Sequence, residues 1–320
     1  MKIMRVIELN HPYSQDQVPT DQVVLALGFF DGVHRGHQAV IHQAKQIAVQ
    51  KKLPLAVMTF DIHPAIVYRN ADRATFRYLS TIDRKQTLMA DLGVDLLYIV
   101  HFNEAFAKLD PQTFVDQYLV ALHAETVVAG FDYTYGKKSV ANMTTLTDYA
   151  QGRFNIVTVA EHDYHGAKIG STLIRDYLDA GRITEANELL GYVYQTTGEV
   201  VHGEARGREL GFPTANIESQ QPERLPGIGI YAVRLFVQGQ WYLGMASIGR
   251  NVTFHRNNPV TVEINLLDFN ADIYGESVKV DWHQYLRGEV KFNSAKELVA
   301  QLHQDEANTR AYFAQLAGQQ

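Results

Sequence analysis

The sequence predicts an α/β domain followed by a small, mainly antiparallel β domain. The chain has 320 residues, which at about 150 residues per domain suggests two domains. In the first half, continuous apolar runs alternate with segments of helical periodicity, the pattern of parallel strands joined by helices. In the second half, short segments of period two are separated by turns that contain glycine, which favours an antiparallel barrel or sandwich.

The strands expected in the first half are apolar runs, typical of strands that are buried on both faces. They are residues 23–30, 54–60, 94–102, 126–133 and 154–160. Helical patterns follow the first of these runs and recur in residues 81–93 and 110–123. The last pattern begins with Asp110 and Pro111, a typical helix start.

Residues 171–191 predict one or two helices between the two halves. Ser171 or Thr172 is a candidate N-cap, and Gly181 interrupts the helical pattern. The two expected domains are residues 1–187 and 188–320.

The second half is expected to contain a hairpin, further alternating strands and a closing helix. The hairpin covers residues 229–249 and turns at the sequence QGQ. The closing helix has Ser294 as its N-cap, with Glu297 three residues later as a capping box. The remaining elements are strands at 259–269 and 276–286 and the helix at 294–316.

Composition places the chain among globular proteins and excludes several kinds of chemistry. The formal net charge of -6 argues against a nucleic-acid surface that depends on net charge. The chain has no cysteine, which excludes disulfides, thiolate zinc sites and cysteine nucleophiles and is consistent with the cytoplasm. No window approaches about 18 consecutive apolar residues, so no membrane span is expected. We expect small-molecule partners and a monomer or weak homo-oligomer.

A glycine-rich segment, GFFDGVHRGH (residues 28–37), follows the first expected strand and opens a helix. Its glycines allow the backbone to approach a ligand, and a helix N-terminus is a natural phosphate site. His34 and His37 could donate hydrogen bonds to phosphate oxygens. The same side chains could instead simply pack at the helix start, the commoner fate of an isolated H-x-x-H pair. The glycines favour the phosphate interpretation.

A metal site is another interpretation of this region. Its candidate ligands are Asp31, His34, His37, Asp61 and His63, which together offer nitrogen and oxygen atoms. We rank it below the phosphate site, because the glycines suit a backbone cradle and the chain has no H-E-x-x-H arrangement.

A second segment, GRELGFPTAN (residues 207–216), has the chemistry of a nucleotide site, although glycine and proline also mark ordinary surface turns. Mg²⁺ prefers phosphates together with a few protein oxygens. The Thr214 hydroxyl and the Asn216 carbonyl could supply such oxygens. Further along, Glu263 lies on the polar face of an alternating strand, where a glutamate most often faces solvent.

These motifs resemble, in order and over nearly the whole chain, those of the bacterial bifunctional riboflavin kinase/FMN adenylyltransferases. GFFDGVHRGH is similar to that family's form of the nucleotidyltransferase H-x-G-H motif. The other matching segments are TFDIHP, GFDYTYGKK, GSTLIRDYLDAGRITEANELLG, GEVVHGEARGRELGFPTANI, VEINLLDF, DIYG and YLRGEVKF.

The resemblance implies a Rossmann-like nucleotidyltransferase domain with a parallel sheet, then a small antiparallel β-barrel with a terminal helix. The barrel would transfer the γ-phosphoryl group of ATP to riboflavin, giving FMN. The first domain would transfer AMP from ATP to FMN, giving FAD and pyrophosphate. Mg²⁺ is the implied metal.

The resemblance also implies roles for individual residues. Glu263 would accept the proton of the riboflavin 5′-hydroxyl, and His34 and His37 would stabilise charge on the phosphates. Thr214 and Asn216 would hold Mg²⁺. The residues implied in binding nucleotide or flavin are Gly28, Phe29, Asp31, Gly36, His63, Asp132, Ser171, Thr172, Arg175, Gly211, Pro213, Thr214, Asn216 and Arg287.

Three alternatives remain open at this point. The chain has Gly170 and Leu173 where the family usually has serine and often arginine, in a loop that helps to hold ATP phosphates. One alternative is therefore a riboflavin kinase with a degenerate adenylyltransferase domain. The others are a non-catalytic flavin- or nucleotide-binding regulator and a metal-dependent hydrolase that uses the Asp/His set.

Overall fold

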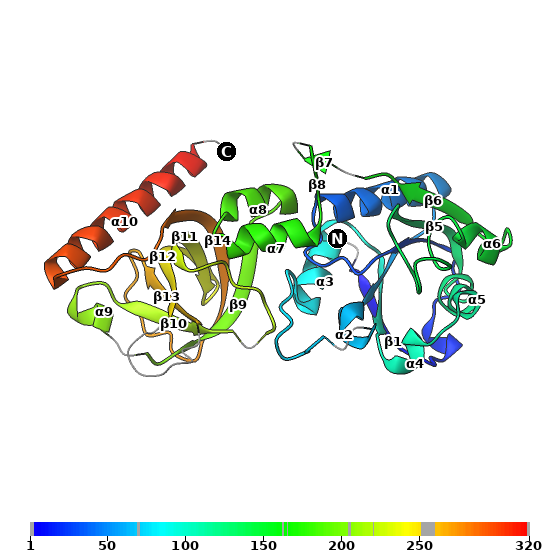
Figure 1. Cartoon of the computed structure of the whole chain (residues 1–320), viewed down its shortest axis with the longest axis horizontal. Helices are drawn as coiled ribbons and strands as arrows, with labels where there is room; N and C mark the ends of the chain where they lie inside the picture. The colour runs from blue at the N-terminus through cyan, green and yellow to red at the C-terminus, as the bar shows by residue number, and fades with distance from the viewer. Residues whose placement is uncertain are drawn as a thin grey trace. The chain divides into compact units, whose positions relative to one another are not determined.

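The chain divides into two structural units. The computed structural model describes residues 3–68, 71–161, 163–164, 166–203, 206–219, 221–250 and 260–318. Unit 1 is Met1–Ser171 and unit 2 is Thr172–Gln320 (Figure 1). This division places the helices Ser171–Asp179 and Ile183–Leu190 in unit 2, apart from Ser171 itself. The sequence analysis instead set the boundary after residue 187. The functional boundary stays a prediction.

Unit 1 is built on a six-stranded sheet in which every pairing is parallel, which confirms the α/β class. In spatial order the strands are β1 (Arg5–Asn10), β4 (Leu96–His101), β3 (Leu55–Phe60), β2 (Val23–Leu27), β5 (Ala124–Gly130) and β6 (Asn155–Val159). All residues of β2 and β3 are buried, as expected for strands covered on both faces.

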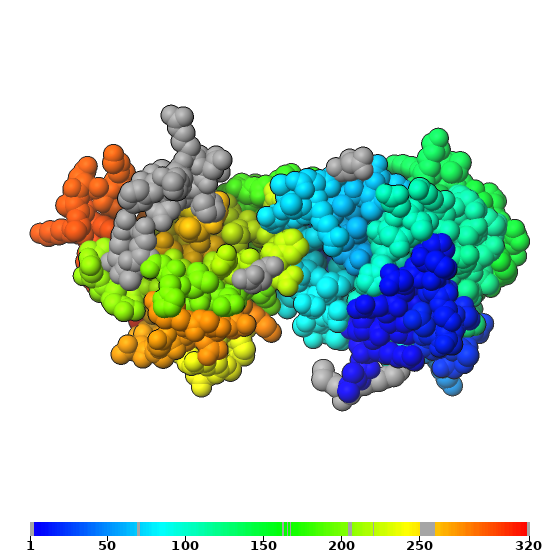
Figure 2. Space-filling model, turned by 90° about the horizontal axis from the view of Figure 1, so that it is seen from below, coloured from blue at the N-terminus to red at the C-terminus, as the bar shows by residue number. Residues whose placement is uncertain are grey.

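The edge strand β1 is an element that the sequence analysis missed. Within it only Ile7 and Leu9 are buried, because a strand at the sheet edge is less covered than a central one. Figure 2 shows this N-terminal segment, in dark blue, at the surface of unit 1. Its period-two pattern is short and mixed, which makes it weak as a sequence signal.

Helices cover both faces of the sheet. On one face, Phe114 and Tyr118 pack in a cluster with Leu25 of β2. On the other, α1 packs against β2 and β5 through Ile41 and Ala44, which lie outside that cluster. The remaining elements of unit 1 are η1 (Gln15–Gln17), α1 (Arg35–Lys51), α2 (Pro64–Tyr68), α3 (Ile82–Asp91), α4 (Glu104–Ala107), α5 (Pro111–Val115), the π-helical turn η2 (Asp116–Val120), α6 (Leu146–Ala150), β7 (Asp163–Tyr164) and β8 (Ala167–Lys168).

The carboxyl ends of the strands carry the motif residues of unit 1. The chain runs from β2 to β3 on one side, and β5 later pairs with the other side of β2, so the strand order reverses at β2. Such a switch point is the usual ligand site of an open parallel sheet. Residues 28–34 follow β2 at this point, and residues 61–63 follow β3.

Unit 2 is a closed antiparallel barrel. Of the two architectures that the sequence predicted, the barrel is therefore correct and the sandwich is not. The strands in order around it are β10 (Thr214–Glu218), β13 (Val260–Leu266), β12 (Gln240–Arg250), β11 (Gly229–Val237), β14 (Ser277–Arg287) and β9 (Tyr194–Val201). The predicted hairpin is confirmed: Gln238 and Gly239, at φ 50° and 82°, form a two-residue turn between β11 and β12. The helices of this part are α7 (Ser171–Asp179), α8 (Ile183–Leu190), α9 (Arg206–Glu209) and α10 (Ala295–Ala317).

The terminal helix α10 has the predicted cap. Ser294 Oγ accepts a hydrogen bond from the Glu297 N–H at 3.2 Å, while Glu297 Oε2 accepts from the Asn293 N–H at 3.0 Å. The reciprocal bond therefore reaches one residue before the N-cap. A buried ion pair fastens the helix to the barrel, because Arg287 Nη2 lies 2.6 Å from Oδ2 of Asp305, which is 1% exposed.

Candidate active sites

The loop between β2 and α1 is held in an unusual backbone conformation. Phe30 and Val33, at φ 56° and 37°, flank Gly32 in the left-handed region. For residues with side chains this region costs about 1–3 kcal/mol each, and a β-branched residue is the least suited to it. A Cβ on Gly28 would lie 2.8 Å from the Phe30 ring, so glycine lets that ring fold back. Strain of this kind concentrates at functional sites.

His34 and His37 stack at the N-terminus of α1. Their ring centroids are 3.6 Å apart, and His34 Nδ1 accepts from the His37 N–H at 3.3 Å as the helix N-cap. Burial, then His34 and then Lys85, lowers the pKa of His37 well below its ordinary value. His37 Nδ1 is buried and has no hydrogen-bond partner among the described residues. Gly36 lies in the same helical turn, where the dipole favours anions.

Three hydrogen bonds tie this loop to the segment before α3. Asp31 Oδ1 accepts from the N–H groups of Leu79 and Ser80 at 3.0 and 3.2 Å. Ser80 Oγ in turn accepts from the Gly32 N–H at 2.8 Å. The carboxylate of Asp31, a predicted binding residue, is 2% exposed and shapes the loop from within.

His63 lies beside the loop at the end of β3. Its ring packs edge-on against Phe29, with centroids 4.7 Å apart. Asp61 is engaged with His101, whose Nδ1 lies 3.0 Å from Asp61 Oδ2. In the part of the chain that the structure describes, no three His, Asp or Glu side chains are grouped so that they could hold a metal ion. The geometry therefore does not assemble the Asp/His set into a metal site.

The other predicted residues of unit 1 lie on the loops that follow β5 and β8. Asp132 is exposed and pairs with Lys168 at 2.9 Å. Ser171 Oγ donates to the Asp31 carbonyl at 3.0 Å. Ser171 is the first residue of α7, so its hydroxyl joins the helix start to the β2–α1 loop and does not form the predicted N-cap. The predicted residues that follow on α7, within unit 2, are Thr172 and Arg175.

In unit 2, the predicted catalytic and metal-binding residues share the outer face of the barrel. Strand register sets Asn216 opposite Glu263 and places Ser247 on the other side of Glu263. The neighbouring Ile264 is buried inside, so these polar side chains point outward, where they are half-buried. Thr214 Oγ1 lies 3.4 Å from Glu263 Oε2. This Asn216–Glu263–Ser247 row, with Thr214, offers only oxygen and amide groups, the chemistry of a hard cation and its phosphates.

Close backbone packing positions the row. A Cβ on Gly203 would lie 2.0 Å from Asn216 Nδ2, so glycine makes room for that amide. Asn265 Nδ2 donates to the Pro213 carbonyl at 2.7 Å and pins the start of β10. Gly211, at φ 84°, makes the preceding turn. Gly211 and Pro213, both predicted binding residues, thus set the course of the backbone that leads to Thr214.

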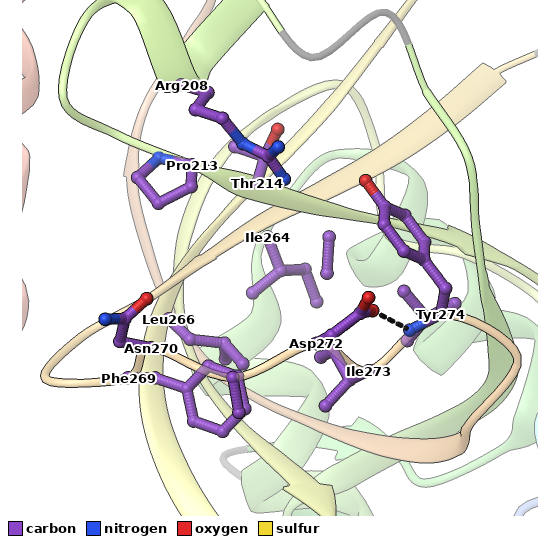
Figure 3. A pocket seen from close by; sticks show the side chains of 13 residues that line it. Arg208, Pro213, Thr214, Ile264, Leu266, Phe269, Asn270, Asp272, Ile273 and Tyr274 are labelled. Carbon is purple, nitrogen blue, oxygen red and sulfur yellow. Dashed lines mark hydrogen bonds between the residues drawn. The ribbon is translucent and has the colours of Figure 1, made fainter.

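A cavity of about 460 Å³ opens beside Thr214. Figure 3 shows Arg208 of α9 on one side, and Asp272 and Tyr274 of the β13–β14 loop on another. Asp272 Oδ1 accepts from the Tyr274 N–H at 3.1 Å, which holds that loop in shape. The volume is typical of a small-molecule site, and Pro213 and Thr214 join it to the oxygen-rich row.

Lys85 is a residue that the sequence analysis missed. It is 2% exposed, and its Nζ donates to the Phe29 carbonyl at 2.7 Å. In α3 it stands three and four residues before Leu88 and Met89, which are both buried. The sequence signal that could have indicated Lys85 is a lysine at an apolar position of an amphipathic helix.

Both candidate sites have a chemistry that suits phosphates. One is a helix N-terminus at a sheet switch point, and the other is an oxygen-lined barrel face beside a cavity. The fold and the sites therefore define a two-domain transferase that acts on phosphorylated nucleotides.

The chain belongs to the family of bifunctional riboflavin kinases/FMN adenylyltransferases. A family model described as FAD synthetase matches residues 16–173, and one described as riboflavin kinase matches residues 190–313. Proteins with the bifunctional name are 51% identical over 313 residues in Listeria monocytogenes, 41% over 315 in Bacillus subtilis and 33% over 316 in Escherichia coli K12. Each match covers 98% of this chain and at least 98% of the relative.

A solved structure shares the fold over almost the whole chain. A crystal structure from Streptococcus pneumoniae, named a macrolide-efflux protein, matches with a TM-score of 0.87 and 37% identity, covering 95% of this chain and 99% of that one. In unit 1 and unit 2 alike, the described helices include none long and apolar enough to cross a membrane.

Proposed function

We propose that unit 2 phosphorylates riboflavin to FMN with ATP, and that unit 1 adenylylates FMN to FAD and releases pyrophosphate. The observation that carries the proposal is that one chain holds two clusters whose chemistry suits phosphates, the His34/His37 stack at a helix N-terminus and the Asn216–Glu263–Ser247 row. Full-length relatives whose name includes both activities support it.

In the kinase reaction, Glu263 would accept the proton of the riboflavin 5′-hydroxyl while that oxygen attacks the γ-phosphorus of ATP and ADP leaves. The Thr214 hydroxyl, 3.4 Å from Glu263 Oε2, would orient the carboxylate. Positioning and charge stabilisation account for most of the catalysis in such transfers. Thr214 Oγ1 and the Asn216 carbonyl fit a hard cation and would hold Mg²⁺, which would neutralise phosphate charge.

In the adenylyl transfer, an oxygen of the FMN phosphate would attack the α-phosphorus of ATP, and the bond to the bridging oxygen would break to release pyrophosphate. No covalent enzyme intermediate is needed. Because burial, His34 and Lys85 hold the pKa of His37 low, its contribution near pH 7 would be a hydrogen bond from a neutral ring. The N-terminus of α1 would supply the positive potential.

The remaining assignments are part of the same proposal. ATP and FMN would be bound in unit 1 by Gly28, Phe29, Asp31, Gly36, His63, Asp132 and Ser171. Thr172 and Arg175 of α7 stay predicted nucleotide-binding residues. Gly211, Pro213 and Arg287 would serve unit 2. We further propose a functional boundary near residue 187, a cytoplasmic location consistent with the absence of cysteine, and a monomer or weak homo-oligomer.

A product assay tests both activities together. Incubation with riboflavin, ATP and Mg²⁺, followed by chromatography, should give FMN and then FAD, and removal of Mg²⁺ with a chelator should stop FMN formation. FMN alone, with no FAD even from added FMN, would leave only the kinase. In that case Gly170 and Leu173 would be the first residues to test as the cause of the missing adenylylation. Neither product would favour the non-catalytic regulator.

A further inference from the structure

Lys85 is a fully buried cation next to the adenylyl-transfer site. Its Nζ donates to the Phe29 carbonyl at 2.7 Å and to Thr59 Oγ1 at 3.1 Å. Thr59 Oγ1 itself donates to the same Phe29 carbonyl at 2.8 Å. The carbonyl oxygen thus accepts two hydrogen bonds, one of them from a charged donor, which makes it a strongly held point of the backbone.

The same lysine also holds the Phe29 side chain. Lys85 Nζ lies 4.2 Å from the centroid of the Phe29 ring, within reach of a cation–π interaction. Phe29 immediately precedes Phe30, the first of the left-handed residues in the loop. Fixing Phe29 at both its carbonyl and its ring therefore sets the direction in which the strained loop leaves β2.

Titratable groups face Lys85 from three parts of the chain. Asp31 after β2 and Asp61 after β3 attract its ammonium, and His37 faces it from α1. Burial nevertheless outweighs the two carboxylates and lowers the pKa of Lys85 to about 8. Lys85 is thus charged at neutral pH, where its positive charge helps to keep His37 neutral.

We propose that Lys85 is a positioning residue for adenylyl transfer, whose buried ammonium fixes Phe29 and so holds the strained loop that presents His34 and His37 to the phosphates. This inference rests on the proposed role of that loop. Lys85 acts through the loop and not on the substrates, so its loss should lower the turnover number of FAD formation more than it changes the KM for FMN.

The first test replaces Lys85 by methionine, which keeps the length of the side chain and removes its charge. FAD formation from added FMN should fall by about 10-fold to 100-fold, the order of loss that a small displacement of reacting groups causes. FMN formation from riboflavin in the same protein should be unchanged. Calorimetry should show little change in the thermal stability of unit 1, because removal of the buried charge offsets the loss of the Lys85 hydrogen bonds.

A matched control uses another lysine that donates to a backbone carbonyl. Lys45 Nζ donates to the Leu92 carbonyl at 2.8 Å, but on the exposed surface. Lys45→Met should leave FAD formation unchanged. Thr59→Val removes the second donor to Phe29 and should give a loss smaller than that of Lys85→Met.

The pH profile provides a readout that a purely structural role would not change. In the wild type, FAD formation should fall above about pH 8, where Lys85 loses its proton. Lys85→Met should lack this alkaline limb, and FMN formation should not show it in either protein.

Two results would overturn the inference. One is FAD formation in Lys85→Met equal to the wild type, while His34→Ala abolishes it. The other is a loss of FAD formation that matches a loss of thermal stability and leaves the alkaline limb in place. If neither Lys85→Met nor His34→Ala reduces FAD formation, the proposed role of the loop itself is wrong.

Discussion

The two candidate sites hold their predicted residues in different surroundings. In unit 1, Asp31 and Lys85 are each 2% exposed and His34 is 5% exposed. In unit 2, Thr214, Asn216 and Glu263 are half-buried on the outside of a barrel. The first site is built by a strained loop that buried charges hold in place, and the second by the register of regular strands.

Because of this difference, the two sites should respond differently to amino-acid substitutions. A site set by strand register places its side chains by backbone pairing, so one substitution removes one group and leaves its neighbours in position. A site set by a loop over buried charges is coupled, because each charge shifts the protonation of the next and helps to fix the same backbone. Substitutions in unit 1 should therefore affect several groups together.

The largest effect is expected at Glu263. Glu263→Gln keeps the size of the side chain and removes the proton acceptor, so FMN formation should fall by a factor on the order of 10² to 10⁴. Chromatography of the reaction products measures this loss, and FAD formation from added FMN should not change. Glu218→Gln, on the neighbouring strand β10, is the matched control. A Glu263→Gln protein that still makes FMN at the wild-type rate would remove this residue from the mechanism.

A smaller effect concerns a buried histidine of unit 2 that packs beneath α10. His283 accepts from Arg234 Nε at 3.1 Å, and burial, then Arg234, lowers its pKa to about 4. The unfolded chain, with a pKa near 6.5, binds the proton first. The free energy of unfolding of unit 2 should therefore fall by about 3 kcal/mol as the pH drops from 6.5 to 4.

Calorimetry at a series of pH values measures this slope. His283→Gln keeps a hydrogen-bond acceptor for Arg234 but does not titrate, so the variant should lose less stability toward low pH. Equal slopes in the two proteins would show that the acid sensitivity arises elsewhere.

The smallest effect is expected at Gly170, where the family resemblance implies a serine. A Cβ at Gly170 would meet nothing within 4 Å, so Gly170→Ser can restore the hydroxyl without a clash. A half-exposed hydrogen bond to a phosphate contributes about 1 kcal/mol. The KM for ATP in FAD formation should fall severalfold, while the kinase reaction stays unchanged. An increase in that KM would mean that the glycine is needed at this position.

Local sequence patterns predicted much of the fold, because each pattern lies within a single strand, helix or turn. The alternation of apolar runs and helical periods predicted the parallel sheet, and the turn at Gln238 and Gly239 and the cap at Ser294 were confirmed. The edge strand β1 was missed because its two buried residues, Ile7 and Leu9, form only a short and mixed period-two pattern.

The candidate sites divide in the same way. The sequence predicted His34 and Thr214 as phosphate or metal-binding groups and Glu263 as a proton acceptor; the structure places His34 at a helix N-cap and Thr214 beside Glu263, and their roles stay predictions. It did not indicate that Ser171 donates to the Asp31 carbonyl or that Arg287 is engaged with Asp305. Each of these contacts joins residues that only folding brings together.

The sequence by itself determined the two-domain plan and the glycines, histidines and carboxylates of the candidate sites, because those depend on residue type and short-range spacing. Only the tertiary structure decided which neighbours surround the titratable side chains of unit 1. Burial and neighbouring charges lower the pKa of His37 and of Lys85. Both effects arise from atoms that are distant in the chain and close in space.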